Sequence, residues 1–199
     1  MDYAELLRSR RMVRHFTDAP VSDDAVERIV AAGLRAPSAG YSQGCSLLVL
    51  RTEDERHRLW ATHSGSERRW SASVRAGLQK APVVIVVLTS KRVYLDRYAA
   101  QDKGWTDRSE SRWPVPYWYV DAGCVAMLIL LSAINEGLGA LLFGMAAGDI
   151  VTFRESFGVP DDIEFVGCIA VGHRDPNAPR RDLRSGQRPI EDLVHLGRW

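Results

Sequence analysis

Two groups of arginines in this sequence could bind an anion. The first lies in residues 8–16, where an extended chain would place Arg10, Met12 and Arg14 on one side and Arg11 on the other. A guanidinium stays charged at any working pH and binds phosphate through two parallel hydrogen bonds. The second group, near the other end of the chain, consists of Arg180, Arg181, Arg184 and Arg188. The two groups would hold one phosphate if they met in space, and would be solvated surface segments otherwise.

Other kinds of site find no support in the motifs. No Gly-x-Gly-x-x-Gly opens a helix after a strand, because Gly137 and Gly139 follow a helix and lack a third glycine. There is no Walker phosphate loop, and Ser38 lacks the Gly-x-Ser-x-Gly elbow of a hydrolase. The histidines show no metal-type spacing with one another or with cysteine; they are His15, His57, His63, His173 and His195.

Composition indicates one globular domain in a reducing compartment. The chain has 199 residues, of which 46% are hydrophobic, enough for one sizeable core. The formal net charge of +1 gives no global field that would attract nucleic acid or an anionic membrane. Cys45, Cys124 and Cys168 are widely separated among apolar neighbours, so we expect buried, reduced thiols. The charged stretch after Met1 does not resemble a signal peptide, and we expect a cytoplasmic protein.

Helical and strand patterns alternate along the chain and predict an α/β or α+β fold. Ser22 is a good N-cap for the second helix, and Pro37 marks its end. The β-branched run after Pro82 predicts a central strand. The expected helices are residues 3–7, 22–36, 53–62, 71–80 and 149–157, and the expected strands are 46–50, 81–89, 140–143 and 165–171.

Three further segments have distinct patterns. Residues 120–134 are apolar apart from Asp121 and number about fifteen, short of the roughly twenty that cross a bilayer, so a buried core helix is expected. Residues 91–118 lack a steady period and carry Trp105, Trp113, Tyr117 and Trp118, which indicates a long excursion acting as a mobile binding loop or as a subunit contact. Residues 173–199 form a polar tail that we expect to wrap the body or a partner.

A series of short motifs runs in order along nearly the whole chain. They are RRMVRHF (10–16), APSAGYSQ (36–43), DAG (121–123), EGLG (136–139), VP (159–160), VG (171–172) and RP (188–189). Together they resemble the motifs of the nitroreductase family of FMN enzymes. The resemblance implies a single α+β domain over residues 1–199, with a central mixed, mainly antiparallel sheet flanked by helices and a long buried helix at the core of a dimer. It also implies an intertwined homodimer with two FMN sites at its interface.

The resemblance further implies an oxidoreductase that transfers hydride from NADH or NADPH through FMN to a small acceptor such as a nitroaromatic or a quinone, in a ping-pong cycle. The flavin carries this reaction, so no catalytic side chain and no metal are expected. The expected cofactor-binding residues are Arg10, Arg11, Met12, Arg14, Pro37, Ser38, Ala39, Tyr41, Gln43, Leu142, Phe143, Gly144, Arg184 and Arg188.

These residues resemble three parts of the family's flavin site. The arginines resemble its contacts to the phosphate, ribityl chain and ring edge. Residues 37–39 match a loop that reaches the flavin of the other subunit, and residues 142–144 match a strand end whose backbone faces the ring. As walls of the substrate pocket we expect the aromatic residues Tyr41, Trp113, Tyr117 and Trp118.

Two departures from the family pattern fall close to the expected flavin ring. Met12 stands where the family usually has serine, so only its main chain could hydrogen-bond the cofactor. Tyr41 replaces the usual asparagine, and Gly44 and Cys45 replace Pro-Trp, so the pocket near the ring has a different shape. Tyr41 could stack over the ring or fill part of the substrate space.

Several alternatives remain open at the level of sequence. The same fold also hosts dehydrogenation, dehalogenation and flavin fragmentation. A non-catalytic flavin-binding protein or a plain dimeric interaction module would have a similar sequence. The motifs name neither the electron donor nor the physiological acceptor.

Overall fold

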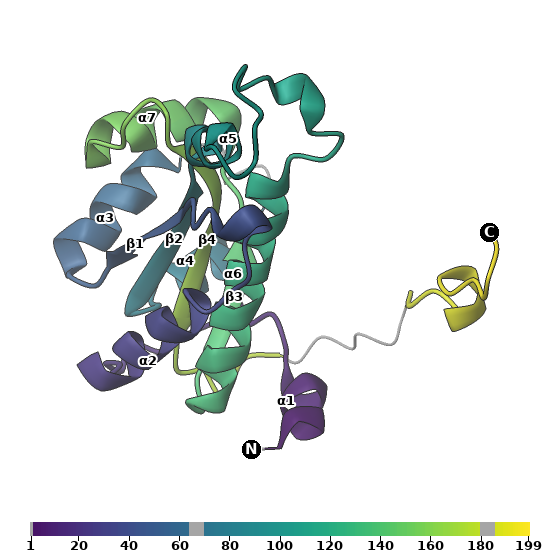
Figure 1. The fold of residues 1–199 in the computed structure, drawn as a ribbon. Helices are drawn as coiled ribbons and strands as arrows, with labels where there is room; N and C mark the ends of the chain where they lie inside the picture. Colours follow the sequence, from purple (N-terminus) through teal and green to yellow (C-terminus); the bar gives the residue numbers. More distant parts are fainter. Residues whose placement is uncertain (1, 64–69, 180–185) are drawn as a thin grey trace.

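A computed structural model describes residues 2–63, 70–179 and 186–199 of the chain. Within these residues, one antiparallel sheet has the strand order β1-β2-β4-β3 (Figure 1). Its strands are β1 (Cys45–Leu50), β2 (Val83–Thr89), β3 (Gly139–Phe143) and β4 (Glu164–Gly172). An isolated parallel bridge joins Met12 to Ala140 beside β3. The predicted mixed, mainly antiparallel sheet is therefore confirmed.

Helices cover both faces of this sheet. They are α1 (Tyr3–Ser9), α2 (Asp23–Gly33), α3 (Glu53–Thr62), α4 (Ala72–Gln79), α5 (Lys91–Ala99), α6 (Tyr117–Asn135) and α7 (Ala147–Phe157), with short 3-10 turns at Ala39–Tyr41, Glu110–Arg112 and Ile190–Asp192. Every residue of β2 is buried, which makes it the central strand that its apolar sequence predicts. Alternate β2 side chains pack with α2 and α6 on one face and with α3, α4 and α7 on the other.

The second helix shows how far local signals carry. The Ser22 side chain accepts a hydrogen bond from the amide of Ala25, as expected of an N-cap. The helix ends at Gly33, three residues before the predicted end, because residues 34–36 form tight turns. A Cβ on Gly33 would lie 2.6 Å from Cγ1 of Ile129, so this glycine lets α2 approach α6 closely.

The long apolar helix α6 is a core helix of the domain, as predicted. It has 19 residues, more than the fifteen expected, and by length and composition it could cross a membrane. Half of its apolar stretch is buried, in contact with α2 and the sheet. Val120 and Met127 lie on its other side and are 44% and 45% exposed.

Residues 91–118 differ from the irregular excursion that was expected. Their first part forms α5, with Tyr94 fully buried. This helix was missed because its contacts use tyrosine and arginine rather than aliphatic residues at helical spacing. Tyr98, near the end of this helix, packs ring against ring with Trp105 and Trp113, with centroids 4.5 to 5.6 Å apart, so aromatic contacts hold the irregular remainder.

The cysteines are free, but only one of them is fully buried. Cys168 in β4 has no exposed surface, and this burial raises the pKa of its thiol. Cys45 and Cys124 are half-buried. The expectation of three buried thiols is therefore right for Cys168 and wrong for the other two, because each of these lies at the edge of the core.

Candidate functional site

The arginine-rich connector runs extended beside β3. The amide of Val13 donates to the carbonyl oxygen of Ala140 at 2.9 Å. A Cβ on Gly139 would lie 2.8 Å from Cγ2 of Val13, so this glycine allows the connector to approach the strand. Phe16 is buried at the end of the segment. The connector is thus fixed by its apolar residues.

The arginines of the connector lack acidic partners. Arg10 and Arg14 are half-buried and Arg11 is exposed. Nη1 of Arg11 donates to the carbonyl oxygens of Arg8 and Arg10 at 2.8 and 2.9 Å, and Nη1 of Arg14 donates to that of Met12 at 3.3 Å. Among the described residues, no carboxylate forms an ion pair with any of the three.

Several arginines elsewhere in the described chain do have such partners. Those paired with a carboxylate are Arg28, Arg51, Arg92, Arg97, Arg108, Arg112 and Arg154. The connector therefore concentrates positive charge that the described part of the protein does not neutralise. This is the donor set that a phosphate requires.

The loop at residues 37–43 has an unusual backbone. Gly40, Tyr41 and Gln43 have φ values of 60°, 56° and 56°, in the left-handed region. Residues other than glycine with a left-handed backbone are uncommon, and they cluster at ligand sites. Within the loop, the amide of Gln43 donates to Oγ of Ser38 at 3.0 Å. Tyr41 is 76% exposed, so the single chain gives its ring little to pack against.

The strand end at residues 142–144 offers backbone rather than side chains. Phe143 is buried and its ring stacks on Trp60 with centroids 5.5 Å apart. Gly144 is exposed, and a Cβ there would meet no atom within 4 Å. A flat ligand could therefore approach the main chain here, which is the role that the sequence predicts for this segment.

A buried histidine lies beneath this strand end and was not anticipated from the sequence. Nδ1 of His63 lies 3.6 Å from Oδ2 of Asp149, and both side chains are almost fully buried. The His63 ring lies 5.8 Å from that of Phe143. Burial lowers the pKa of His63, with Arg75 acting in the same direction and Asp149 opposing. An isolated histidine and aspartate far apart in sequence carry no motif, so no sequence signal could have found the pair.

This burial makes stability fall on acidification. The pKa of His63 is lowered in the folded state, whereas in the unfolded chain it is about 6.5, so the unfolded state binds the proton more readily. The contribution is fully present above pH 6.5 or so and is lost as the pH falls through the folded-state pKa. We expect His63→Gln to flatten the decline in melting temperature between about pH 6.5 and 5. His57→Gln, at an exposed histidine of α3, is the matched control; equal slopes in both variants and the parent would contradict this role.

The four residues expected to wall a substrate pocket are not equally available. Trp118 is buried and packs edge-on against Tyr94 and Trp113. Trp113 is half-buried in the same aromatic cluster, whereas Tyr117 and Tyr41 are exposed. Trp113 and Trp118 thus have a clear packing role, and the pocket assignment stays a prediction.

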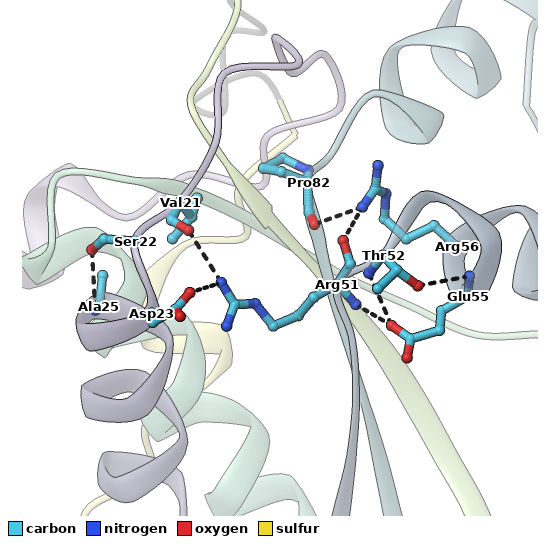
Figure 2. Close-up of polar contacts among 9 residues, drawn as sticks. All are labelled: Val21, Ser22, Asp23, Ala25, Arg51, Thr52, Glu55, Arg56 and Pro82. Atoms are coloured by element: carbon cyan, nitrogen blue, oxygen red, sulfur yellow. Dashed lines mark hydrogen bonds and ion pairs between the residues drawn. The ribbon is translucent and has the colours of Figure 1, made fainter.

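A separate surface hollow of about 620 Å³ lies where β1 ends and β2 begins. Figure 2 shows that its arginines are already engaged. Arg51 pairs with Asp23 and donates to the carbonyl oxygen of Val21, and Arg56 donates to that of Pro82 at 3.1 Å. These guanidiniums stabilise the ends of β1 and α2, and the hollow includes none of the expected cofactor residues.

The second arginine group is only partly described. Arg180, Arg181 and Arg184 lie outside the described residues. Arg188 is exposed and donates to the carbonyl oxygen of Asp192 at 3.1 Å. Its segment, residues 186–199, lies apart from the sheet and its helices (Figure 1). One chain therefore does not bring Arg188 to the connector, and the joint phosphate clamp stays a prediction.

Solved structures with this fold span almost the entire chain. Nitroreductase CinD from Lactococcus lactis, solved with nicotinic acid, has a TM-score of 0.77 at 18% identity, covering 99% of this chain and 100% of that one. A nitroreductase family protein from Clostridium difficile 630 gives 0.74 at 20%, with 100% of both chains covered. A Desulfovibrio desulfuricans protein assigned as a nitroreductase and solved with FMN gives 0.70 at 26%, covering 96% and 94%. The fold is that of the nitroreductases.

The sequence comparisons agree with the fold. The family model described as Nitroreductase family matches residues 7–173. An Archaeoglobus fulgidus protein assigned as an NADH dehydrogenase/NAD(P)H nitroreductase is 22% identical over 197 residues, covering 98% of this chain and 97% of its own. The chain belongs to the nitroreductase family and is an oxidoreductase of that flavin-dependent type, which confirms the predicted family.

Proposed function

We propose that this protein binds FMN and uses it to pass electrons from NADH or NADPH to a small organic acceptor such as a nitroaromatic or a quinone. The observation that carries the proposal is the set of connector arginines without acidic partners among the described residues. They lie beside β3, which is followed by the exposed Gly144. The FMN bound to the D. desulfuricans relative and the name of a Staphylococcus aureus relative, NADPH-dependent oxidoreductase, support it. The latter is 24% identical over 200 residues, covering 100% of this chain and 74% of its own.

The residues present fit the cofactor. Arg10, Arg11 and Arg14 supply fixed positive charge for the phosphate. The exposed main chain at Gly144 leaves room for a flat ring system. Bound FMN would supply the hydride chemistry, which leaves the protein the tasks of binding, orientation and exclusion of water.

The departures at the ring face acquire a structural meaning. The Met12 side chain packs into both apolar clusters on the two faces of the sheet, so it serves the core, and only its main chain could meet the cofactor. Tyr41 is exposed on a loop in which the amide of Gln43 donates to Oγ of Ser38. We propose that its ring covers the flavin or narrows the space above it, so that it selects which acceptor enters.

We also propose a homodimer with the cofactor between its subunits. The side of α6 turned away from α2 presents exposed apolar residues. The most exposed are Val120 and Met127, which lie about two helical turns apart. Exposed apolar residues in a continuous stripe mark an interaction surface. The hollow of about 620 Å³ where β1 ends and β2 begins includes no expected cofactor residue, which suits a site that a second chain completes. A cytoplasmic location is part of the same proposal.

The decisive experiment is the visible spectrum of the purified protein, with the released cofactor identified by mass. A flavin spectrum and the mass of FMN are expected, followed by bleaching on anaerobic titration with NADH or NADPH. A colourless protein that fails to bind added FMN would overturn the proposal. A coloured protein that neither nicotinamide reduces would instead be a flavin carrier or would use another donor.

A further inference from the structure

One face of α5 lies against the loop expected to reach the flavin. Tyr94, Arg97 and Tyr98 occupy this face, at helical spacings of three and four residues. Nε of Arg97 donates to the carbonyl oxygen of Gly40 at 2.9 Å. A Cβ on Gly40 would lie 2.7 Å from Cε2 of Tyr98, and one on Gly44 would lie 2.4 Å from Cε2 of Tyr94. The loop therefore rests on α5 at its middle, Gly40, and at its far end, Gly44.

A single carboxylate oxygen joins this loop to two helices. Oδ2 of Asp121, on α6, accepts hydrogen bonds from the amide of Ala39 and from the hydroxyl of Tyr94, both at 2.8 Å. Asp121 is 6% exposed and Tyr94 is fully buried. Burial and the neighbouring Asp121 both raise the pKa of Tyr94, so its hydroxyl stays protonated and donates. Loss of either donor would leave a buried charge with one fewer hydrogen bond.

The contact also accounts for a departure from the family pattern. Gly44 and Cys45 stand where the family usually has Pro-Trp, and the Tyr94 ring fills part of the space beside Gly44. No residue with a Cβ fits there while Tyr94 stays in place, since the two atoms would approach to 2.4 Å. Gly44 and Tyr94 therefore act together as one packing unit.

We propose that Tyr94, Arg97, Tyr98 and Asp121 are positioning residues that hold residues 38–44 in the conformation that receives FMN. None of them is among the residues expected to touch the cofactor. Through them, the affinity for FMN depends on the placement of α5 and of the aromatic cluster that continues from α5. The inference rests on the proposed function where it concerns FMN, whereas its claim about the loop concerns the protein alone.

The test compares two tyrosine-to-phenylalanine variants. Tyr94→Phe removes the hydroxyl that donates to Asp121, and Tyr119→Phe removes one that donates to Glu164, away from the loop. Amide hydrogen exchange of residues 38–44 is measured in each purified variant without FMN, and the FMN dissociation constant is measured by fluorescence titration. We expect Tyr94→Phe to speed exchange in this segment and to weaken FMN binding about tenfold, and Tyr119→Phe to change neither by more than about twofold.

Variants at Asp121 separate hydrogen bonding from general damage to the fold. In Asp121→Asn an amide oxygen can still accept both hydrogen bonds, whereas Asp121→Leu accepts neither. Asn should therefore keep exchange of residues 38–44 and FMN affinity nearer to the parent than Leu does. Equal behaviour of Tyr94→Phe and Tyr119→Phe, or faster exchange spread evenly over the chain, would overturn the proposal. If the parent protein binds no FMN, the proposed function fails while the exchange measurement still decides whether these residues position the loop.

Discussion

Replacement of Arg14 by glutamine is expected to raise the FMN dissociation constant about 10- to 100-fold. Arg14 is half-buried beside β3 and has no acidic partner among the described residues, so its charge is available to the phosphate. A hydrogen bond to a charged group contributes about 1.5 to 3 kcal/mol, and about 1.4 kcal/mol corresponds to a tenfold change. Titration of the FMN-free protein, followed by flavin fluorescence, gives the constant directly.

Arg28→Gln provides the matched control for this measurement. Arg28 already pairs with Glu136 at 2.7 Å and lies on α2, so its loss should leave FMN affinity within about twofold. The Arg14 effect should also shrink when the flavin offered is riboflavin, which has no phosphate. Equal losses for FMN and riboflavin would show that Arg14 supports the ring or the fold and does not bind the phosphate.

Replacement of Met127 by aspartate is expected to convert the proposed dimer into monomers. Met127 lies on the exposed apolar side of α6, and a second chain packed there would bury the new carboxylate without a partner. Such burial costs several kcal/mol, which would weaken association by about a thousandfold or more. Sedimentation velocity across micromolar concentrations measures the change in mass.

Val151→Asp is the control for the loss of an exposed apolar residue. Val151 on α7 is 58% exposed and lies away from α6, so its aspartate variant should remain dimeric. The Met127→Asp monomer should also lose bound FMN, since the proposed site needs both chains. A coloured monomer would place the whole cofactor site within one chain, and an unchanged dimer would place the interface elsewhere.

Local signals in the sequence were enough to predict most of the elements. The β-branched run of residues 83–89 identified the central strand, because only a strand covered on both faces is apolar at every position. Ser22 marked the start of α2 correctly, since an N-cap acts within one turn.

The missed features depend on contacts between distant parts of the chain. Tyr94 and Asp121 are 27 positions apart, and Ala39 and Asp121 are 82 apart. Neither pair has a local pattern, so the role of α5 and its helical state were both hidden. The buried pair of His63 and Asp149 was hidden for the same reason. In the candidate site, motif order could suggest which residues meet the cofactor but not which residues hold them.

The backbone at Tyr41 has a consequence for how the protein balances stability against selectivity. A tyrosine with a φ of 56° lowers the free energy of unfolding by about 1 to 2 kcal/mol. Glycine or asparagine at the same φ would lower it far less. Asparagine is also the residue that the family usually has at this point. With the proposed role of Tyr41 over the flavin, this loss of folding free energy is what presents an aromatic ring to the cofactor; such losses are typical of positions governed by function rather than by folding.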